Sequence, residues 1–294
     1  MKWGVLLVTL LMIPGFVLAG TISLTTSVTT EVLTTDEGIV QISITNFGDE
    51  SAYSVQLSLL SDYFTSASVP IGTLPINEPF ATNISINANN DVKEGNYPLV
   101  LLTEYTDANG YPFSSVSPVT ITYKTPHPSR ITGVFENIEL SGKKAKDLVL
   151  KLKNMDQVSH DVKIELFLPN ELSSDSTEKI LTLGSKEEKV LIFKVSNFAG
   201  LEGSNYVVLA SIEYDGDYHH SSIASGMVKI VEASSFPTGM IGTIGGVNFL
   251  GQWVYFVVIG LLVVIFIIYQ IKSKKLEFKV LKEGSDEKEG EEGG

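Results

Sequence analysis

The sequence predicts an all-β chain with two similar domains, followed by one transmembrane helix. Apolar and polar residues alternate in many short segments between residues 20 and 232, as in strands with one buried face. Positions in the first half of this region recur in the second half at a nearly constant spacing. A charge-free apolar run then occupies residues 253–271. Between the two ends of the chain, no segment shows a sustained helical period.

The predicted strands are separated by turn-forming residues. The alternating apolar residues include Val40, Ile42 and Ile44; Val55, Leu57 and Leu59; Ile84 and Ile86; Leu148, Leu150 and Leu152; Val162, Ile164 and Leu166; and Leu191, Phe193 and Val195. Turns rich in Asn, Asp and Gly are predicted at residues 46–48, 89–91, 109–110, 154–156 and 215–217. The spacing of these turns indicates about seven short strands in each half.

The two halves match each other. Tyr97 and Ile121 correspond to Tyr206 and Ile230, and both pairs are 109 residues apart (206 − 97 and 230 − 121). Asn46 corresponds to Asn154 at a spacing one residue shorter. A shared spacing over many residues indicates a tandem duplication.

Seven strands in about 100 residues favour an immunoglobulin-like (Ig-like) β-sandwich for each half. Tyr97 and Tyr206 each follow a Gly-containing turn at the start of an apolar strand, where this fold places its tyrosine corner. Leu99 and Val208 stand where antibody domains carry a cysteine. The alternative is that both tyrosines are ordinary strand residues.

The predicted organisation is therefore two tandem Ig-like domains between short terminal segments. Residues 1–19 resemble a signal peptide cleaved after Ala19, although an uncleaved anchor is the alternative. The first sandwich covers residues 20–124, and residues 125–129 form a proline linker. The second sandwich covers residues 130–232, and a Gly-rich stalk covers residues 233–251. The transmembrane helix is placed at residues 252–271 and the charged tail at residues 272–294.

The apolar run predicts a single membrane crossing. Its 19 residues would extend about 29 Å as a helix, close to the thickness of a hydrocarbon core. Lys272, Lys274 and Lys275 follow it directly, and lysines mark the cytoplasmic side. We therefore expect a type I protein of the cell membrane, with residues 21–250 outside. The run has no ionisable group, which favours a plain anchor over a transport role.

Residues 36–57, DEGIVQISITNFGDESAYSVQL, are similar to the opening of CARDB-like and surface-layer-associated Ig-like domains of archaeal and bacterial envelope proteins. Those domains combine a strand, Thr-Asn-x-Gly, a polar stretch, Ala and a second alternating strand. In this family Asn46 and Gly48 would form the turn between the two strands. The second copy keeps Asn154 but has Asp156 in place of glycine. The resemblance implies a fold and an envelope setting, and it carries no catalytic residues.

Composition excludes several classes of function. The net charge is −13, of which the tail from Lys272 contributes about −1 (six Lys against seven acidic residues). Nucleic-acid binding needs a cationic surface, so we expect no nucleic-acid partner. The chain has no cysteine, which excludes disulfides, thiol catalysis and cysteine metal sites.

Candidate chemical sites are few. His219 and His220 are adjacent, but neighbouring residues on a strand point to opposite faces, so one metal ion does not easily bind both. The segments 215–217 and 107–109 could offer oxygens to calcium, but they read as hairpin turns. Catalytic motifs and a phosphate-binding loop are absent, so we expect no enzyme activity, cofactor or metal. Asn83 begins the only Asn-x-Ser/Thr sequon and is a candidate for N-glycosylation.

The expected function is that of a membrane-anchored structural or adhesion protein of the cell envelope. Its helix would contact membrane lipid, and its exposed strands and loops would contact a protein partner. The alternative is an accessory Ig-like subunit of a membrane complex for secretion or glycosylation. A solute or metal sensor is a third hypothesis, for which the tail is short and featureless.

Overall fold

The computed structural model describes residues 20–232, together with residues 260–262, 265, 269 and 272. Residues 20–232 belong to one compact unit, and a second unit begins at Ser235. Among the described residues, no helix is both long enough and apolar enough to cross a bilayer. The predicted signal peptide, the stalk, most of the predicted transmembrane segment and the tail beyond Lys272 lie outside the described residues.

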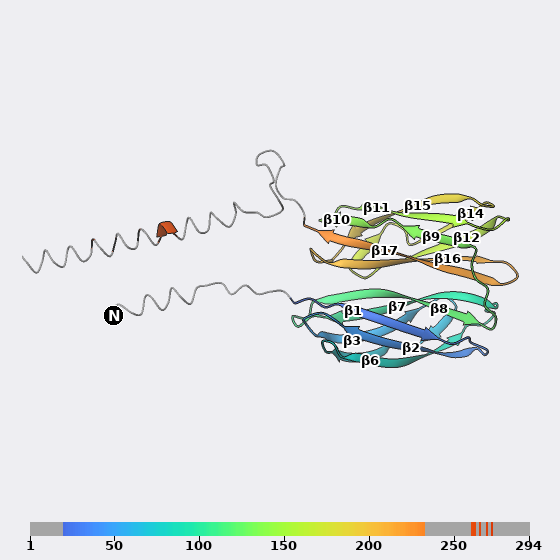
Figure 1. Cartoon of the computed structure of the whole chain (residues 1–294), viewed down its shortest axis with the longest axis horizontal. Coiled ribbons are helices and arrows are strands. Elements are labelled where there is room, and N and C mark those ends of the chain that lie inside the picture. Colours follow the sequence, from blue (N-terminus) through green and yellow to red (C-terminus); the bar gives the residue numbers. More distant parts are fainter. Residues whose placement is uncertain (1–19, 233–259, 263–264, 266–268, 270–271, 273–294) are drawn as a thin grey trace, which may run out of the picture. The chain divides into compact units, whose positions relative to one another are not determined.

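The first half folds into a sandwich of two four-stranded layers, which agrees with the predicted all-β class (Figure 1). Its strands are β1 (Leu24–Thr30), β2 (Glu37–Asn46), β3 (Ala52–Leu60), β4 (Phe64–Ser66), β5 (Val69–Leu74), β6 (Pro79–Ala88), β7 (Gly95–Thr106) and β8 (Pro112–Tyr123). One layer has the order β1-β2-β6-β4, and the other has β8-β7-β3-β5. These orders correspond to the two sheets of an Ig-like sandwich, with β5 added to the edge of the second sheet.

The second half repeats this arrangement and adds one strand. Its strands are β9 (Ile131–Phe135), β10 (Ile138–Ser141), β11 (Lys146–Asn154), β12 (His160–Phe167), β13 (Leu172–Ser174), β14 (Glu178–Leu183), β15 (Glu188–Asn197), β16 (Asn205–Asp215) and β17 (His219–Val231). One layer has the order β13-β15-β11-β9, and the other has β14-β12-β16-β17 with β10 paired to β17. The extra strand β10 runs parallel to β17.

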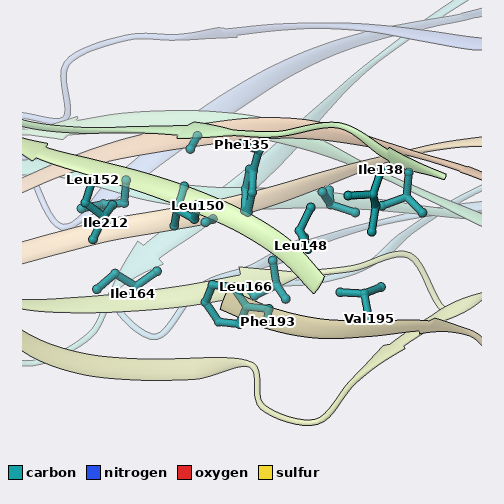
Figure 2. Close-up of a cluster of buried hydrophobic side chains, with 14 of the residues drawn as sticks. Phe135, Ile138, Leu148, Leu150, Leu152, Ile164, Leu166, Phe193, Val195 and Ile212 are labelled. Atoms are coloured by element: carbon teal, nitrogen blue, oxygen red, sulfur yellow. The ribbon is translucent and has the colours of Figure 1, made fainter. Parts of the chain in front are cut away.

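Each sandwich has its own apolar core, built by the predicted alternation. In the first sandwich, Val40, Ile42 and Ile44 of β2 lie beside Ile84 and Ile86 of the neighbouring strand β6 within one buried cluster. In the second sandwich, the equivalent side chains come from β11, β12 and β15, and Figure 2 shows them meeting between the strands. A fully buried aliphatic side chain contributes about 1.5–3 kcal/mol, so these cores supply the stability that disulfides would otherwise add.

A tyrosine corner closes the first sandwich, as its position after a glycine turn predicts. The Tyr97 hydroxyl donates to the carbonyl of Lys93 (2.7 Å). Tyr206 is also buried in the second sandwich. Its hydroxyl lies near the Ser204 side chain and the Leu201 backbone, but it makes no well-formed hydrogen bond to any described residue. The corner is therefore complete in the first copy only.

Asn46 and Asn154 are fully buried and organise equivalent turns. The Asn46 side chain accepts from the Gly48 and Ser23 amides and donates to the Glu50 carbonyl. The Asn154 side chain accepts from the Asp156 amide and donates to carbonyls that include that of Val158. Each buried side-chain amide forms three or more hydrogen bonds with backbone groups that would otherwise have no partner in these turns.

Gly48 differs from Asp156 for a steric reason. A Cβ at Gly48 would lie 1.9 Å from the carbonyl oxygen of Thr21, because the first residues of the sandwich cross this turn. Asp156 has room for a side chain, which contacts His160 at 3.1 Å. In the second copy the Met155 amide still donates to the Arg130 carbonyl (2.8 Å), and the Asp156 carboxylate accepts from the Gln157 amide, so this turn accommodates a side chain.

The two sandwiches point in opposite directions. Strands β7 and β16 occupy equivalent places in the two copies, and β16 runs antiparallel to β17. Strand β17, in turn, touches β7 in parallel through the pair His219 and Gly95. Strand β16 is therefore antiparallel to β7, and the chain reverses between β8 and β9. The two copies form an antiparallel pair rather than an extended row.

We expect Asn46→Ala and Asn154→Ala each to lower the free energy of unfolding by about 1–3 kcal/mol, because each change leaves several buried backbone groups without a partner. Urea denaturation of the full chain measures this loss. Asn87→Ala, at an exposed position on β6, is the matched control and should change stability by less than about 0.5 kcal/mol. Equal effects at Asn46 and Asn87 would contradict the role assigned to the buried amides.

Candidate functional site

The chemically richest part of the described chain is the interface between the two sandwiches. Strands β7 and β8 of the first sandwich and β12, β16 and β17 of the second bring their outer faces together. The centre of this interface is apolar: Val100, Val116 and Leu209 are buried there. Leu102, Phe167 and Ile223 pack around them. The sheets that would face water in isolated sandwiches are therefore covered.

The backbones of the two sandwiches pair directly at Gly95. The amide of His219 donates to the carbonyl of Glu94 (2.9 Å), which continues the hydrogen bonding from one sandwich to the other. A Cβ at Gly95 would lie 2.0 Å from the His219 carbonyl oxygen. Glycine is required here because no side chain fits between the two strands.

A buried glutamate ties the second sandwich to the backbone of the first. Glu171 is 2% exposed, and its two carboxylate oxygens accept from the amide and the hydroxyl of Ser114 on β8. The Ser114 hydroxyl also accepts from the amide of Asn170 (2.7 Å). Burial raises the pKa of the Glu171 carboxyl above its usual range, and the bonds from Ser114 oppose this shift. The hydrogen bonds to Ser114 therefore fix the position of the Glu171 carboxyl, but burial of its charged form lowers stability.

His219 lies in a second polar cluster at the far edge of the interface. Its Nδ1 atom is 2.8 Å from Asp215 Oδ1, and its Nε2 atom is 3.2 Å from Glu213 Oε2. The ring stacks on Tyr97 of the first sandwich, with centroids 4.1 Å apart. Burial, together with carboxylates that include Asp215 and Glu213, raises the pKa of the Tyr97 and Tyr63 hydroxyls. Both tyrosines therefore remain neutral.

The predicted opposite orientation of His219 and His220 is confirmed. His219 packs on Tyr97 and Tyr63, whereas the His220 ring stacks on Tyr214 and lies near His127. Within the described residues, no group of three or more His, Asp or Glu side chains is arranged to hold a metal ion. The imidazole of His219 instead lies between two carboxylates, with Nδ1 hydrogen-bonded to Asp215 and Nε2 close to Glu213.

The aspartates considered for calcium act within their turns. Asp107 accepts from the amides of Asn109 and Tyr111, and these bonds lower the pKa of its carboxyl. Asp215 contacts His219 with one oxygen and Lys93 with the other (3.5 Å). Both segments form the hairpin turns that their composition predicts.

Asn83 lies apart from the interface, on the outer face of β6. Asn83 and Ser85 are exposed, whereas Ile84 between them is buried. Both side chains of the sequon therefore point away from the core. The neighbours of Asn83 across the sheet are uncharged: Gln41 lies opposite, with Thr29 beyond it.

Two hollows lie along the seam between the sandwiches. The larger has a volume of about 540 Å³ and is lined by residues that include Leu60, Asp62, Val116, Glu165 and Phe167. The smaller, about 200 Å³, reaches the edge of His219, although that residue is only 2% exposed. Lys163 bonds to Asp62 across the seam (2.9 Å), which raises the lysine pKa and holds this edge closed.

The sequence contained a signal for this interface. Residues 98–102 (Pro-Leu-Val-Leu-Leu) and 207–210 (Val-Val-Leu-Ala) are apolar without alternation. A strand that is apolar on both sides is covered on both sides. The alternation of the other strands predicts a single buried face for each, so the interface between the two covered strands is not predicted from the sequence.

Comparison with known proteins adds little to this description. No family model matches the chain, and no curated protein matches it. An α-2-macroglobulin from Salmonella is similar over 71% of this chain at 9% identity, with a TM-score of 0.31. This chain spans 16% of that structure. A Porphyromonas gingivalis protein of unknown function aligns over 69% of this chain and 98% of its own, at 14% identity and a TM-score of 0.29. A PapD-like domain of human CEP192 aligns over 36% of this chain and 88% of its own, at 12% identity and a TM-score of 0.25.

Glu171 makes the stability of the paired sandwiches pH-dependent. Because burial raises its pKa, its contribution is complete below the ordinary glutamate pKa of about 4.3 and is lost as pH rises through the raised value. We expect Glu171→Gln, which is never charged, to gain stability relative to the natural chain as pH rises from 4 to 7. Thermal unfolding of both chains across this range measures the difference. Glu139→Gln at an exposed position on β10 is the control, and a Glu171→Gln difference that does not vary with pH would contradict the assignment.

Proposed function

We propose that the protein is a membrane-anchored structural or adhesion protein of the cell envelope, with two Ig-like sandwiches outside the cell and no catalytic activity. The observation that carries this proposal is the burial of the two polar clusters between the sandwiches. Their most reactive groups are enclosed: Glu171, Glu213 and His219 are each no more than 5% exposed. A substrate cannot reach groups that are already packed between two sheets, so these groups suit a structural role.

Anchoring rests on the sequence. The charge-free run at residues 253–271 is long enough to cross a bilayer, and lysines follow it. The resemblance of residues 36–57 to CARDB-like and surface-layer-associated domains supports the envelope setting. A protein partner would bind through the ectodomain, either by adding a strand to an exposed sheet edge or by contacting loops at the ends of the sandwiches.

Cysteine labelling of intact cells tests this topology, since the natural chain has no cysteine to react. In the full chain, Asp217→Cys lies in an exposed turn, and Lys274→Cys lies behind the apolar run. We expect a membrane-impermeant maleimide to label position 217 on intact cells and to label position 274 only after lysis. The reverse pattern would contradict the proposed orientation.

An accessory subunit of a secretion or glycosylation complex would show the same topology. Isolation of the full chain in mild detergent, with cross-linking, separates the two hypotheses. Recovery at fixed stoichiometry with a translocase or transferase would contradict an independent structural role. Recovery alone, or with surface-layer material, is the expected result.

We propose further that Asn83 carries an N-glycan. Its outward position beside the exposed Ser85 supports this modification on the folded chain. We expect Asn83→Gln to lower the apparent mass of the mature protein by one glycan, as measured by mass spectrometry, without changing its unfolding. Asn87→Gln, on the same face of β6 but outside the sequon, is the control. An unmodified Asn83 in the natural protein would remove this part of the proposal.

A further inference from the structure

Both ends of the ectodomain lie at one tip of the paired sandwiches. The first described residues cross the turn after β2, where the Asp49 amide donates to the Thr21 carbonyl (2.9 Å). In the same turn, Glu50 accepts from the Ala108 amide in the turn after β7 (2.8 Å). These contacts place the N-terminal end beside two turns of the first sandwich.

The C-terminal end joins the same tip through the second sandwich. The Tyr111 hydroxyl donates to the Ala199 carbonyl (2.9 Å), which joins the turn after β7 to the turn after β15. In the latter turn, the Gly203 amide donates to the Ile230 carbonyl, close to the end of β17 (2.9 Å). Figure 1 shows the start of the coloured chain and the end of β17 on the same side. We call this end, formed by turns 47–51, 75–78, 107–111 and 198–204, the terminal tip.

The terminal tip exposes large apolar side chains. Phe198 is 72% exposed, Phe47 is 59% exposed and Leu201 is 44% exposed. Of the eight phenylalanines in residues 20–232, only Phe47 and Phe198 are classed as exposed, and both lie at this tip. Ile76 and Tyr111 add smaller exposed surfaces. Exposed aromatic residues gathered at one place mark an interaction surface.

The opposite tip exposes apolar side chains of other types. Its exposed apolar residues are Val32, Met155, Val158 and Tyr218. None of these is a phenylalanine, and the Tyr218 ring stacks on His127 with centroids 3.6 Å apart. The bulk of the unpaired aromatic surface is therefore at the end where the chain enters and leaves.

We propose that the terminal tip rests on the outer surface of the lipid bilayer, with Phe47, Phe198 and Leu201 in the headgroup region. This proposal rests on the anchoring proposed above. About twenty residues separate Glu232 from the apolar run, and the chain leaves the ectodomain at this tip. Such a connection reaches about 70 Å when extended, so it permits contact without forcing it. Phe and Leu side chains insert at the headgroup–acyl boundary where a protein lies on a bilayer, which makes lipid the matching partner.

The charges at the terminal tip select the type of lipid. Its four turns carry five acidic residues and no Lys or Arg: Asp49, Glu50, Glu78, Asp107 and Glu202. Lys143 lies outside these turns, beside the end of β17. Because acidic groups predominate, we expect the tip to favour zwitterionic over anionic headgroups. The contact depends on apolar side chains and should form on zwitterionic lipid.

The test uses the full chain reconstituted in phosphatidylcholine vesicles that contain a headgroup spin-labelled lipid. A fluorescent label is attached at Leu201→Cys on the terminal tip or at Asp217→Cys on the opposite tip. We expect quenching several-fold stronger at position 201 than at position 217. Phe47→Ser with Phe198→Ser should reduce it to the level at position 217, and the matched pair Val32→Ser with Val158→Ser should leave it unchanged.

Retention of the chain on the vesicles after an alkaline wash is measured in the same samples. A retained chain with equal quenching at positions 201 and 217 overturns the proposed contact but leaves the anchor intact. A chain that is washed off overturns the anchor and the contact together. A retained chain whose quenching at position 201 survives the double phenylalanine change also overturns the contact, because the named side chains would then not make it.

Discussion

The structure depends on one constraint: the outer faces of β7 and β16 must be removed from water. Each strand is apolar on both sides, and one side already forms the core of its own sandwich. Val100 and Leu209 remain on the other side, and each sandwich covers the residue of the other. Because burial of aliphatic surface stabilises by about 25 cal/mol per Å², the two copies gain more as a pair than as separate domains. A short linker that reverses the chain satisfies this requirement. The proline segment at residues 125–129 therefore acts as a turn between domains.

Polar groups inside the interface decide how the two sheets meet. An apolar contact alone would allow the sheets to slide, since the hydrophobic effect has no direction. The bonds of Glu171 to Ser114 and of Ser221 to the Asn96 carbonyl (2.7 Å) fix the position of one sheet on the other. Because the same groups lose their hydration on burial, they lower the stability of the interface while they fix a single register between the two sheets. Two separate polar clusters, one near each end of the interface, constrain rotation as well as translation.

Much of each sandwich could be predicted from the sequence, but the relation between the sandwiches could not. Period-two alternation located the strands, and Asn46, Asn154 and Tyr97 located turns that the structure contains. These features depend on neighbours close in sequence or on one buried face. The role of His219 depends on Tyr97, more than a hundred residues away, and on a reversal of direction that strand patterns do not encode. The sequence predicts Gly95 as part of a turn. In the structure, its lack of a side chain allows the backbone of the second sandwich to contact it.

Strand β17 has a mechanical consequence for a protein held by its C-terminal end. It is paired along most of its length with β16 on one side, and near its end with β10 on the other. A force applied through residue 232 along the axis of β17 would load these hydrogen bonds in shear. Bonds loaded in shear must break together, whereas bonds at a peeled edge break one after another. The parallel strand β10, whose counterpart in the first sandwich is a single bridge between Leu33 and Tyr123, increases the number of bonds that share the load. The second sandwich is thus reinforced at the strand that would carry tension between the cell and whatever the ectodomain holds.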